Sequence, residues 1–436
     1  MNKKSVANNA FWIISIQVVK SLLGMIISMF TARFLGPSNF GLINYASAIV
    51  AFVAPIMYLG LNNILVQEVV NNPQKEGEVL GSSITLSGIS AFLCMGGIFS
   101  FVSIVNRGEK ETIIVCALYS ILLLFQALEL MVYWFQAKLL SKYSSSVMLV
   151  AYVFISCYRI FLLATEKNIY WFAISYALDY LIIALGLFII YKKLGGAKLC
   201  FKFETAKKLL QKSRYYIVSS MMVTVFAQTD RIMLKLMIDD AATGFYSAAV
   251  TCASLTSFVF SAIIDSFRPL IFEDKKHSKE KYERDVKNLY GIIIYISLLQ
   301  SIVITLFSTL IVNILYGAAF SPTINALRII VWYTTFSYLG SVRNIWILAE
   351  NKQKYLWMIN LSGAIANIVL NLILIPISGV CGAALASLIT QIFTNVIVGF
   401  IIKPIRYNNV LMLQSLNPKI LINTIKTLLK IKIGDR

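Results

Sequence analysis

Long apolar stretches alternate with short polar breaks along almost the whole chain. A bilayer core of about 30 Å is crossed by roughly 20 apolar residues in a helix. Stretches of that length recur twelve times, which predicts an all-α membrane protein with twelve transmembrane helices. The predicted spans are residues 10–32, 41–66, 80–105, 112–136, 145–165, 170–191, 215–236, 243–267, 288–312, 325–348, 355–377 and 380–402.

The basic side chains predict the orientation of these spans. With the N-terminus inside, the segments on the cytoplasmic side hold 29 of the 39 Lys and Arg residues, and the outer loops hold four. Cytoplasmic loops of membrane proteins carry such an excess of Lys and Arg. The asymmetry therefore predicts an even number of spans, with both termini in the cytoplasm.

Composition narrows the class of protein. Hydrophobic residues make up 58% of the chain and charged residues 14%, which excludes a soluble enzyme. The net charge of +19 is explained by cationic loops against anionic lipid, so no nucleic-acid partner is expected.

Residues 192–214 form the clearest internal boundary, since eight cations are concentrated there. We expect an N-terminal six-helix bundle at 1–191, a basic cytoplasmic linker at 192–214 and a C-terminal six-helix bundle at 215–402. The basic tail at 403–436 has apolar residues at helical spacing, which fits either an interfacial helix or a solvated segment.

A short repeat relates the two predicted bundles. WFQAKLLSKY at Trp134–Tyr143 and WILAENKQKY at Trp346–Tyr355 share Trp, Ala, Lys and Tyr at an offset of 212, between the fourth and fifth spans of each bundle. Six spans per bundle bring both copies into the membrane in the same direction. The repeat therefore predicts two parallel, pseudo-symmetric bundles.

The first and seventh spans each carry a polar face. Side chains on such a face must meet protein or a water-filled cavity, because a charge that faces hydrocarbon is costly. Close helix packing explains the small residues equally well, but not the cations. The faces consist of Gln17, Lys20, Gly24, Ser28 and Thr31 on the first span, and of Ser220, Thr224, Gln228, Arg231 and Lys235 on the seventh.

Embedded charges are the candidates for function. Lys20 and Arg343 have no evident partner, and unpaired cations in a cavity suit a polyanion such as a diphosphate. Arg159 and Asp179 lie at similar depth, so an ordinary ion pair is the alternative interpretation for them. Asp179 and Glu129 are the candidates for ion coupling, since an embedded carboxyl group can bind and release a proton.

Three asparagines follow one stripe of the eleventh span. Asn360, Asn367 and Asn371 could contact sugar hydroxyls, and hydrogen bonding between helices explains them as well.

Catalytic and metal chemistry have no sequence support. The six cysteines form no C-x-x-C pair, and the one histidine, His277, lies in a charged run. The phosphate-binding pattern G-x-x-x-x-G-K-[ST] is absent. We therefore expect no enzyme activity, no catalytic residues, no metal and no cofactor.

Several segments resemble polysaccharide biosynthesis flippases. The most specific is RFLGPSNFG at Arg33–Gly41, and TDRIMLKLMIDDAATGFYSAAV at Thr229–Val250 and LYGAAFSP at Leu315–Pro322 add to it. The chain is similar to Wzx-type O-antigen or oligosaccharide flippases of the multidrug, oligosaccharidyl-lipid and polysaccharide exporter superfamily.

The resemblance implies a function, a location and a substrate site. Such a protein moves undecaprenyl-diphosphate-linked oligosaccharide across the bacterial cytoplasmic (inner) membrane by alternating access, coupled in some members to a proton or sodium gradient. Its partners would be the lipid-linked substrate, membrane lipids, a polysaccharide polymerase and a chain-length regulator. The resemblance implies a cationic substrate cavity, and the residues that match this role are Lys20, Arg159, Arg231 and Arg343.

Three alternatives remain open. Composition does not exclude a scramblase or channel. A drug or organic-cation antiporter of the same superfamily would need carboxylates in its cavity. A membrane-embedded polymerase or acyltransferase usually carries a large outer loop or an embedded histidine, and neither is predicted here.

Overall fold

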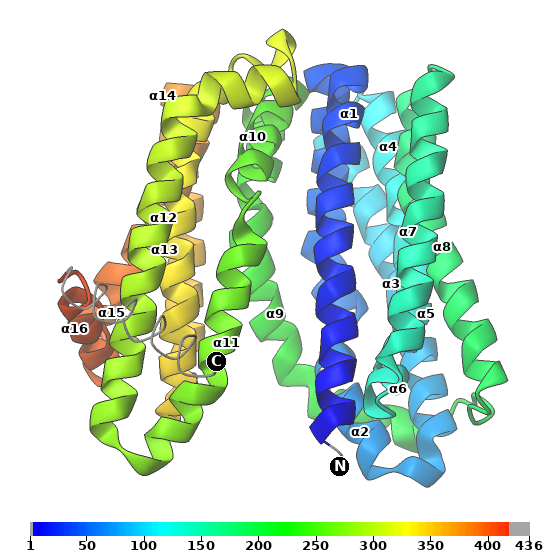
Figure 1. Ribbon diagram of the computed structural model, residues 1–436. Helices are drawn as coiled ribbons and strands as arrows, with labels where there is room; N and C mark the ends of the chain where they lie inside the picture. Colours follow the sequence, from blue (N-terminus) through cyan, green and yellow to red (C-terminus); the bar gives the residue numbers. More distant parts are fainter. Residues whose placement is uncertain (1–2, 418–436) are drawn as a thin grey trace, which may run out of the picture. The chain divides into compact units, whose positions relative to one another are not determined.

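The computed structural model describes the backbone of residues 3–417 and the side chains of residues 12, 19 and 23–417. Every regular element in this part of the chain is a helix, so the all-α prediction is confirmed there (Figure 1). The predicted tail lies outside the described residues from 418 onward.

The chain divides into two compact units, residues 1–244 and 245–436. The first unit contains nine complete helices of the described chain and the start of α10. They are α1 (Lys3–Met57), α2 (Leu65–Asn71), α3 (Glu76–Val105), α4 (Lys110–Ser120), α5 (Leu122–Glu129), α6 (Val132–Ala137), α7 (Ser141–Ala164), α8 (Ile169–Lys193), α9 (Phe203–Met237) and α10 (Asp240–Ala253).

A glycine divides α1 into two helices. Gly36 has φ 74° and ψ 172°, a non-helical conformation that glycine adopts without a steric penalty. Pro37 follows and has no N–H to donate to the preceding turn. The kink lies in the gap predicted between the first and second spans, so the two predicted spans correspond to the two halves of α1.

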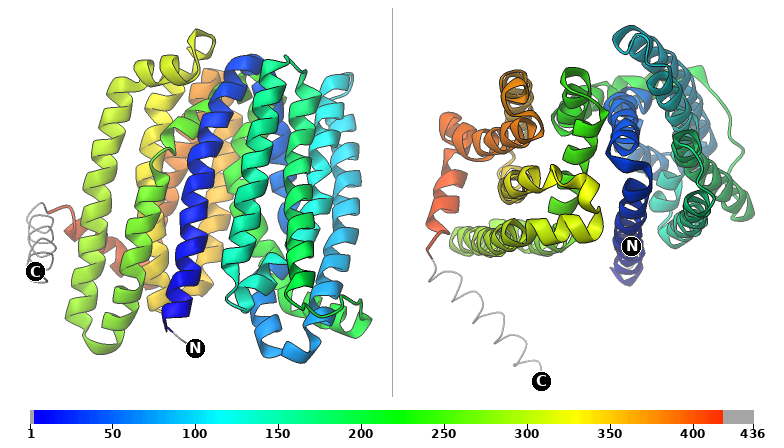
Figure 2. Two further views of the ribbon diagram at one scale, coloured as in Figure 1. Left: turned by 45° about the vertical axis from the view of Figure 1, so that its right-hand side comes forward. Right: turned by 90° about the horizontal axis from the view of Figure 1, so that it is seen from above.

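The core of the first unit lies where α1 packs against α3, α4, α7, α8 and α9 (Figure 2). Fully buried side chains such as Tyr45, Leu123 and Phe172 fill it. α9 begins at Phe203, so the last part of the predicted linker is helical and continuous with the predicted seventh span. By its contacts, α9 belongs to the first unit.

The second unit is built around the packing of α12 against α13 and of α13 against α14. Gly379 (φ 56°, ψ −127°) divides α14 just as Gly36 divides α1, again at a predicted break between spans. Its helices are the rest of α10, α11 (Ser257–His277), α12 (Lys279–Leu315), α13 (Thr323–Ala349), α14 (Leu356–Ile392), α15 (Val398–Ile401) and α16 (Arg406–Gln414).

The two copies of the predicted repeat have the same backbone geometry. Each helix ends before a residue in the left-handed region, Leu139 at φ 57° in one copy and Asn351 at φ 52° in the other, at the predicted offset. In each copy the next N–H donates to the carbonyl oxygen five residues earlier, at 2.7 Å and 2.9 Å respectively. This turn satisfies a helix-terminal carbonyl that would otherwise lack a partner.

Seven helices of the described chain are long and apolar enough to cross a membrane, or eight if the bent pair α10 and α11 counts as one span. The chain is therefore a multi-pass membrane protein. Two of the seven, residues 23–57 and 353–401, each cover two predicted spans. α9 is not among the seven because its polar face lowers its hydropathy. Twelve separate spans and the side on which the termini lie remain predictions.

The outer surface of α3 is apolar. Phe92, Leu93 and Ile104 are 66%, 72% and 74% exposed, which would be unusual on a helix that faces water. Hydrocarbon is the environment that suits this surface.

Candidate functional site

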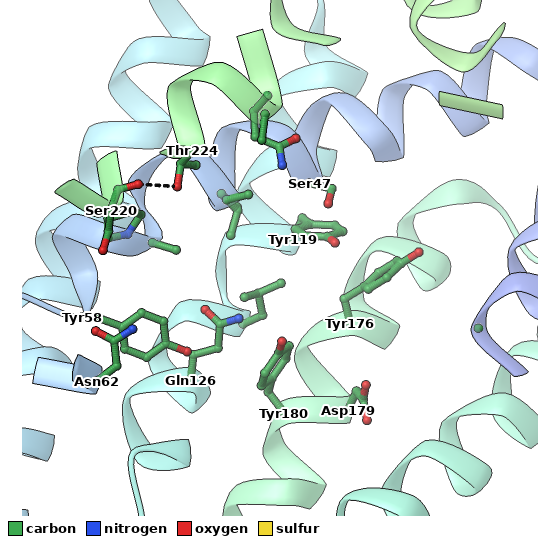
Figure 3. A pocket seen from close by; sticks show the side chains of 18 of the residues that line it. Ser47, Tyr58, Asn62, Tyr119, Gln126, Tyr176, Asp179, Tyr180, Ser220 and Thr224 are labelled. Carbon is green, nitrogen blue, oxygen red and sulfur yellow. Dashed lines mark hydrogen bonds between the residues drawn. The ribbon is translucent and has the colours of Figure 1, made fainter. Parts of the chain in front are cut away.

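A cavity of about 850 Å³ lies within the first unit. Both halves of α1 contribute to its wall, together with α4, α5, α7, α8, α9 and the short turn at Leu61–Asn63. Figure 3 shows hydroxyl, phenol and amide groups around it. Such a volume is in the usual range of small-molecule sites, about 300–1,000 Å³.

The polar faces predicted on the first and seventh spans both line this cavity. One turn of α9 is visible in Figure 3, where the Thr224 hydroxyl donates to the Ser220 carbonyl oxygen at 3.0 Å. Gln17 and Lys20 lie outside the side chains that the structure describes. The lining positions from these faces are Gly24, Ser28 and Thr31 on α1, and Ser220, Thr224 and Gln228 on α9.

Gly24 allows α7 to approach α1 closely. A Cβ atom added at Gly24 would lie 2.8 Å from the Tyr152 hydroxyl oxygen. Tyr152 is itself nearly buried and lines the cavity. Close helix packing therefore explains why residue 24 is a glycine. This agrees with the alternative interpretation of the small residues on the first span.

Arg159 on α7 is the cavity-lining cation with a described side chain. It is 8% exposed. Its Nε donates to Ser175 Oγ at 3.0 Å, and its guanidinium lies 4.0 Å from the centre of the Tyr176 ring. The described structure gives its two terminal nitrogens no hydrogen bond, so they remain available as donors beside the cavity.

The ordinary ion pair considered for Arg159 and Asp179 is not formed in the described structure. Asp179 on α8 lines the cavity and is half-buried, with interactions of its own. The partners of Arg159 are instead a hydroxyl and an aromatic ring. A neutral pair of partners holds the guanidinium without neutralising its charge.

Tyrosines are the cavity residues that sequence reasoning missed. Five of them line it, and the rings of Tyr119 and Tyr176 lie with their centroids 4.7 Å apart. A signal was present on α8, because Tyr176, Asp179 and Tyr180 follow one another at the spacing that places side chains on one helix face. The five are Tyr58, Tyr119, Tyr152, Tyr176 and Tyr180.

Two other predicted site residues lie near the cavity without lining it. Arg231 is half-buried, and its Nη1 donates to the Oε1 atom of the cavity residue Gln228 at 2.8 Å. Glu129, half-buried at the end of α5, lies one turn beyond the cavity residue Gln126. Both have further interactions within the protein.

Arg343 belongs to the second unit and is 4% exposed on α13. Its Nη1 donates to the Thr394 carbonyl oxygen at 2.8 Å, and its Nη2 donates to Asn344 Oδ1 at 3.3 Å. Thr394 lies in a π-helical turn at Phe393–Ile397. Arg343 thus fastens α13 to this turn within the second unit.

The three predicted asparagines also lie in the second unit, on α14. Asn367 and Asn371 are buried, and Asn371 Nδ2 donates to Asn367 Oδ1 at 3.2 Å. Asn360 is half-buried. Asn367 and Asn371 therefore already use part of their hydrogen-bonding capacity on each other within one helix.

Lys235 has a different environment from Arg231, the other cation on the polar face of α9. Its Nζ lies 2.7 Å from Glu109 Oε2 and 2.8 Å from Asp240 Oδ2. Glu109 also accepts a hydrogen bond from the Thr112 hydroxyl at 2.7 Å. The hydrogen bond from Lys235 lowers the pKa of Glu109 below its ordinary value.

Lys235, Glu109 and Asp240 form an ion cluster. Beside it, two glycines allow the backbones of α1 and α10 to approach each other closely. A Cβ at Gly41 would lie 1.7 Å from the Asp240 carbonyl oxygen, and one at Gly244 would lie 2.1 Å from the Pro37 carbonyl oxygen. Only glycine fits at such distances. The start of α10 therefore packs directly on the second half of α1.

Within the described residues, no group of three or more His, Cys, Asp or Glu side chains has the arrangement of a metal site.

Comparison with protein-family models relates this chain to a known family. A family model described as "Polysaccharide biosynthesis protein" matches residues 6–275. No curated protein sequence matches the chain.

Solved membrane transporters have a similar fold. An inward-facing multidrug resistance MATE family transporter of the MOP superfamily has a TM-score of 0.67 at 13% identity, covering 90% of this chain and 95% of its own. The lipid II flippase MurJ, in an inward closed conformation, has a TM-score of 0.66 at 15% identity, covering 97% and 93% respectively. A eukaryotic MATE transporter has a TM-score of 0.61 at 12% identity, covering 94% and 98%. At these identities the likeness shows a shared fold.

Proposed function

The chain belongs to the polysaccharide biosynthesis protein family, and from this premise we propose that it is a flippase for undecaprenyl-diphosphate-linked oligosaccharide. It would move this lipid from the cytoplasmic to the periplasmic leaflet of the bacterial cytoplasmic membrane. The shared fold with MurJ, itself described as a lipid II flippase, supports a lipid-linked substrate.

The proposal rests on one observation. A polar cavity lies inside an apolar helical protein, and a buried cation, Arg159, is fixed in its wall. Arg159 is fixed by Ser175 and Tyr176, and its terminal nitrogens are available. A guanidinium fork matches the geometry of phosphate oxygens and keeps its charge at any physiological pH. Arg159 would therefore bind the diphosphate, with Lys20, Arg231 and Arg343 as further candidate cations.

The remaining features of the mechanism are part of the same proposal. Twelve helices in two six-helix bundles would alternate in access to the two sides of the membrane, with both termini in the cytoplasm. Asp179, which lines the cavity, is the stronger candidate for ion coupling, and Glu129 is the weaker one. The asparagines of α14 would contact sugar, and a polymerase with a chain-length regulator would consume the product.

The direct test is lipid translocation in proteoliposomes. Purified protein is reconstituted with undecaprenyl-diphosphate-linked N-acetylglucosamine, and a periplasmic-type glycosidase added outside measures the sugar that reaches the outer leaflet. Wild-type protein should accelerate exposure, and Arg159→Gln should abolish most of the acceleration. Equal rates in liposomes with and without protein would overturn the proposal.

The same assay tests coupling. An imposed proton or sodium gradient should change the wild-type rate, and Asp179→Asn should remove that response. A wild-type rate that ignores both gradients would exclude coupling. In parallel proteoliposomes without the glycosidase, the recovered lipid should be chemically unchanged by mass spectrometry, whereas a polymerase or acyltransferase would alter it.

One observation favours a second candidate, an organic-cation antiporter. Asp179 lies between Tyr176 and Tyr180 on one face of α8, and a carboxylate among aromatic rings attracts cations. Ethidium uptake into the same proteoliposomes distinguishes the two candidates. Uptake that is driven by a gradient and lost in Asp179→Asn would support the antiporter.

A further inference from the structure

The cavity has two chemically different ends. At one end Arg159, Tyr119 and Tyr176 contact one another, since the guanidinium lies over the Tyr176 ring and the two rings lie together. The Tyr176 ring is therefore already occupied by two neighbours. This end presents a cation to the cavity.

The other end is formed mainly by neutral side chains, with the Asp179 carboxylate next to Tyr180 on α8. Figure 3 shows Tyr58, Asn62, Gln126 and Tyr180 grouped together, apart from the Tyr119 and Tyr176 pair. Tyr58 follows α1, Asn62 lies in the turn at Leu61–Asn63, Gln126 is on α5 and Tyr180 is on α8. Four separate segments thus bring two phenols and two amides to one place.

The two phenol side chains at this end line the cavity and have no ring or cation partner among the described residues. Tyr58 and Tyr180 are half-buried, and within the described residues neither ring stacks on another ring or beneath a cation. Both side chains pack against the core of the first unit and also line the cavity. A ligand in the cavity could therefore contact both phenols.

Sugars match this combination of groups. A pyranose ring has a face of C–H bonds, slightly positive, which suits the negative face of an aromatic ring. Its hydroxyls each donate and accept, and the amides of Asn62 and Gln126 offer both functions in one side chain. The carboxamides carry no charge, so they hold a neutral sugar without a desolvated ion.

We propose that Tyr58 and Tyr180, with Asn62 and Gln126, form a subsite for a neutral sugar of the lipid-linked oligosaccharide, separate from the anion-binding end at Arg159. This inference rests on the proposed function and deepens it, because it divides the cavity between the two parts of the substrate. The diphosphate meets the cation, and a sugar unit contacts the two phenols and the two amides.

Binding to two probes separates the ends of the cavity. The full-length protein in nanodiscs is titrated with undecaprenyl diphosphate, which has no sugar, and with the same lipid carrying N-acetylglucosamine. Wild type should bind the sugar-bearing lipid about tenfold more tightly, a preference that aromatic and amide contacts can supply. Tyr180→Ala and Gln126→Leu should remove most of this preference and leave the affinity for undecaprenyl diphosphate unchanged.

Two matched variants check the assignment to the ring. Tyr180→Phe keeps the aromatic face and should keep most of the preference. Tyr143→Ala removes a tyrosine that is 41% exposed on α7 and does not line the cavity, so it should behave as wild type. Thermal unfolding of each variant identifies any that is misfolded, and Gln126→Leu tests the subsite without removing a ring.

The outcomes separate this inference from the proposed function. If Tyr180→Ala and Gln126→Leu weaken both lipids equally or leave the preference intact, the sugar subsite is wrong while the flippase stands. If wild type binds neither lipid, the flippase proposal itself fails. If the tyrosine variants lose ethidium binding and keep the sugar preference, the rings form a cation site and the inference is overturned.

Discussion

Arg159 and Lys235 are both cations buried in the first unit, and their surroundings differ in kind. Lys235 has a 5% exposed side chain held between two carboxylates at 2.7 and 2.8 Å. Arg159 is held by a hydroxyl and an aromatic ring, with no carboxylate paired to it in the described structure. Burial alone therefore does not distinguish a structural cation from a binding one.

The difference lies in what each partner leaves available. Two carboxylates neutralise Lys235 and accept from two of its three N–H donors, which joins Asp240 and Glu109 through one ammonium group. Ser175 and Tyr176 orient Arg159 but leave its charge and its terminal nitrogens unused. A cation positioned by neutral groups is prepared for an anionic ligand, whereas one between carboxylates joins segments of the fold.

Removing Lys235 should have the largest effect on stability. Lys235→Ala leaves Asp240 and Glu109 close together without a cation, and we expect a loss of about 2–3 kcal/mol in the free energy of unfolding. This is less than for a fully buried pair, because the Glu109 side chain is 46% exposed to solvent screening.

Thermal unfolding of the purified protein in detergent measures this effect. Lys235→Arg, which keeps the charge, should recover much of the loss. An unfolding temperature for Lys235→Ala equal to that of wild type would show that the ion cluster does not hold the segments together.

Disrupting the close backbone contact between Gly41 and Asp240 should have the next largest effect on stability. Gly41→Ala places a Cβ 1.7 Å from the Asp240 carbonyl oxygen, so the two backbones must separate. Overpacking of this kind costs about 1–3 kcal/mol. Lower yield of folded protein and a lower unfolding temperature are the expected results.

Gly96→Ala is the matched control for Gly41→Ala. A Cβ at Gly96, within α3, meets nothing within 4 Å, so this variant should be as stable as wild type or slightly more stable. If both variants behave alike, the contact between Gly41 and Asp240 is not a constraint on the fold.

Through the ion cluster, the stability of the protein should also depend on pH. Because the pKa of Glu109 is lowered in the folded state, its ionised form stabilises the protein above its ordinary pKa of about 4.3. That contribution is lost as the pH falls through the lowered value. Its size should be below about 1 kcal/mol, since the side chain is half-exposed.

Unfolding temperatures of wild type and Glu109→Gln, recorded from pH 7 to pH 3, separate the contribution of Glu109 from those of the other carboxylates. Wild type should be the more stable at pH 7, and the two should converge as the pH falls. A constant difference over the whole range would contradict the assignment to Glu109.

Arg159 should show a small effect on stability and a large effect on transport. Arg159→Gln loses one hydrogen bond and one ring contact, worth about 1 kcal/mol together. Transport of undecaprenyl-diphosphate-linked N-acetylglucosamine should fall about tenfold or more if the diphosphate binds there.

Arg159→Lys sharpens this last prediction. It keeps the charge and loses the guanidinium fork, so its transport rate should lie between those of wild type and Arg159→Gln. If Arg159→Gln unfolds as readily as Lys235→Ala and loses transport only in proportion, Arg159 is a structural cation and the comparison fails.

Patterns along the chain were enough to determine the helices and their polar faces. Apolar stretches of spanning length predict the all-helical membrane protein, and the spacing of Ser220, Thr224 and Gln228 predicts the face of α9 that lines the cavity. Each of these depends on residues close together in sequence, where helix geometry fixes the relative positions.

Only the tertiary structure decided which charges are paired and what else faces the cavity. Arg231 and Lys235 lie one turn apart on α9, yet Arg231 binds Gln228 while Lys235 binds Glu109, 126 residues away. Tyr58 and Tyr180 line the same cavity although they come from segments far apart in the sequence. Spacing in the sequence gives the direction of a side chain around its own helix, but its partners depend on how helices pack, and that is determined by contacts between distant segments.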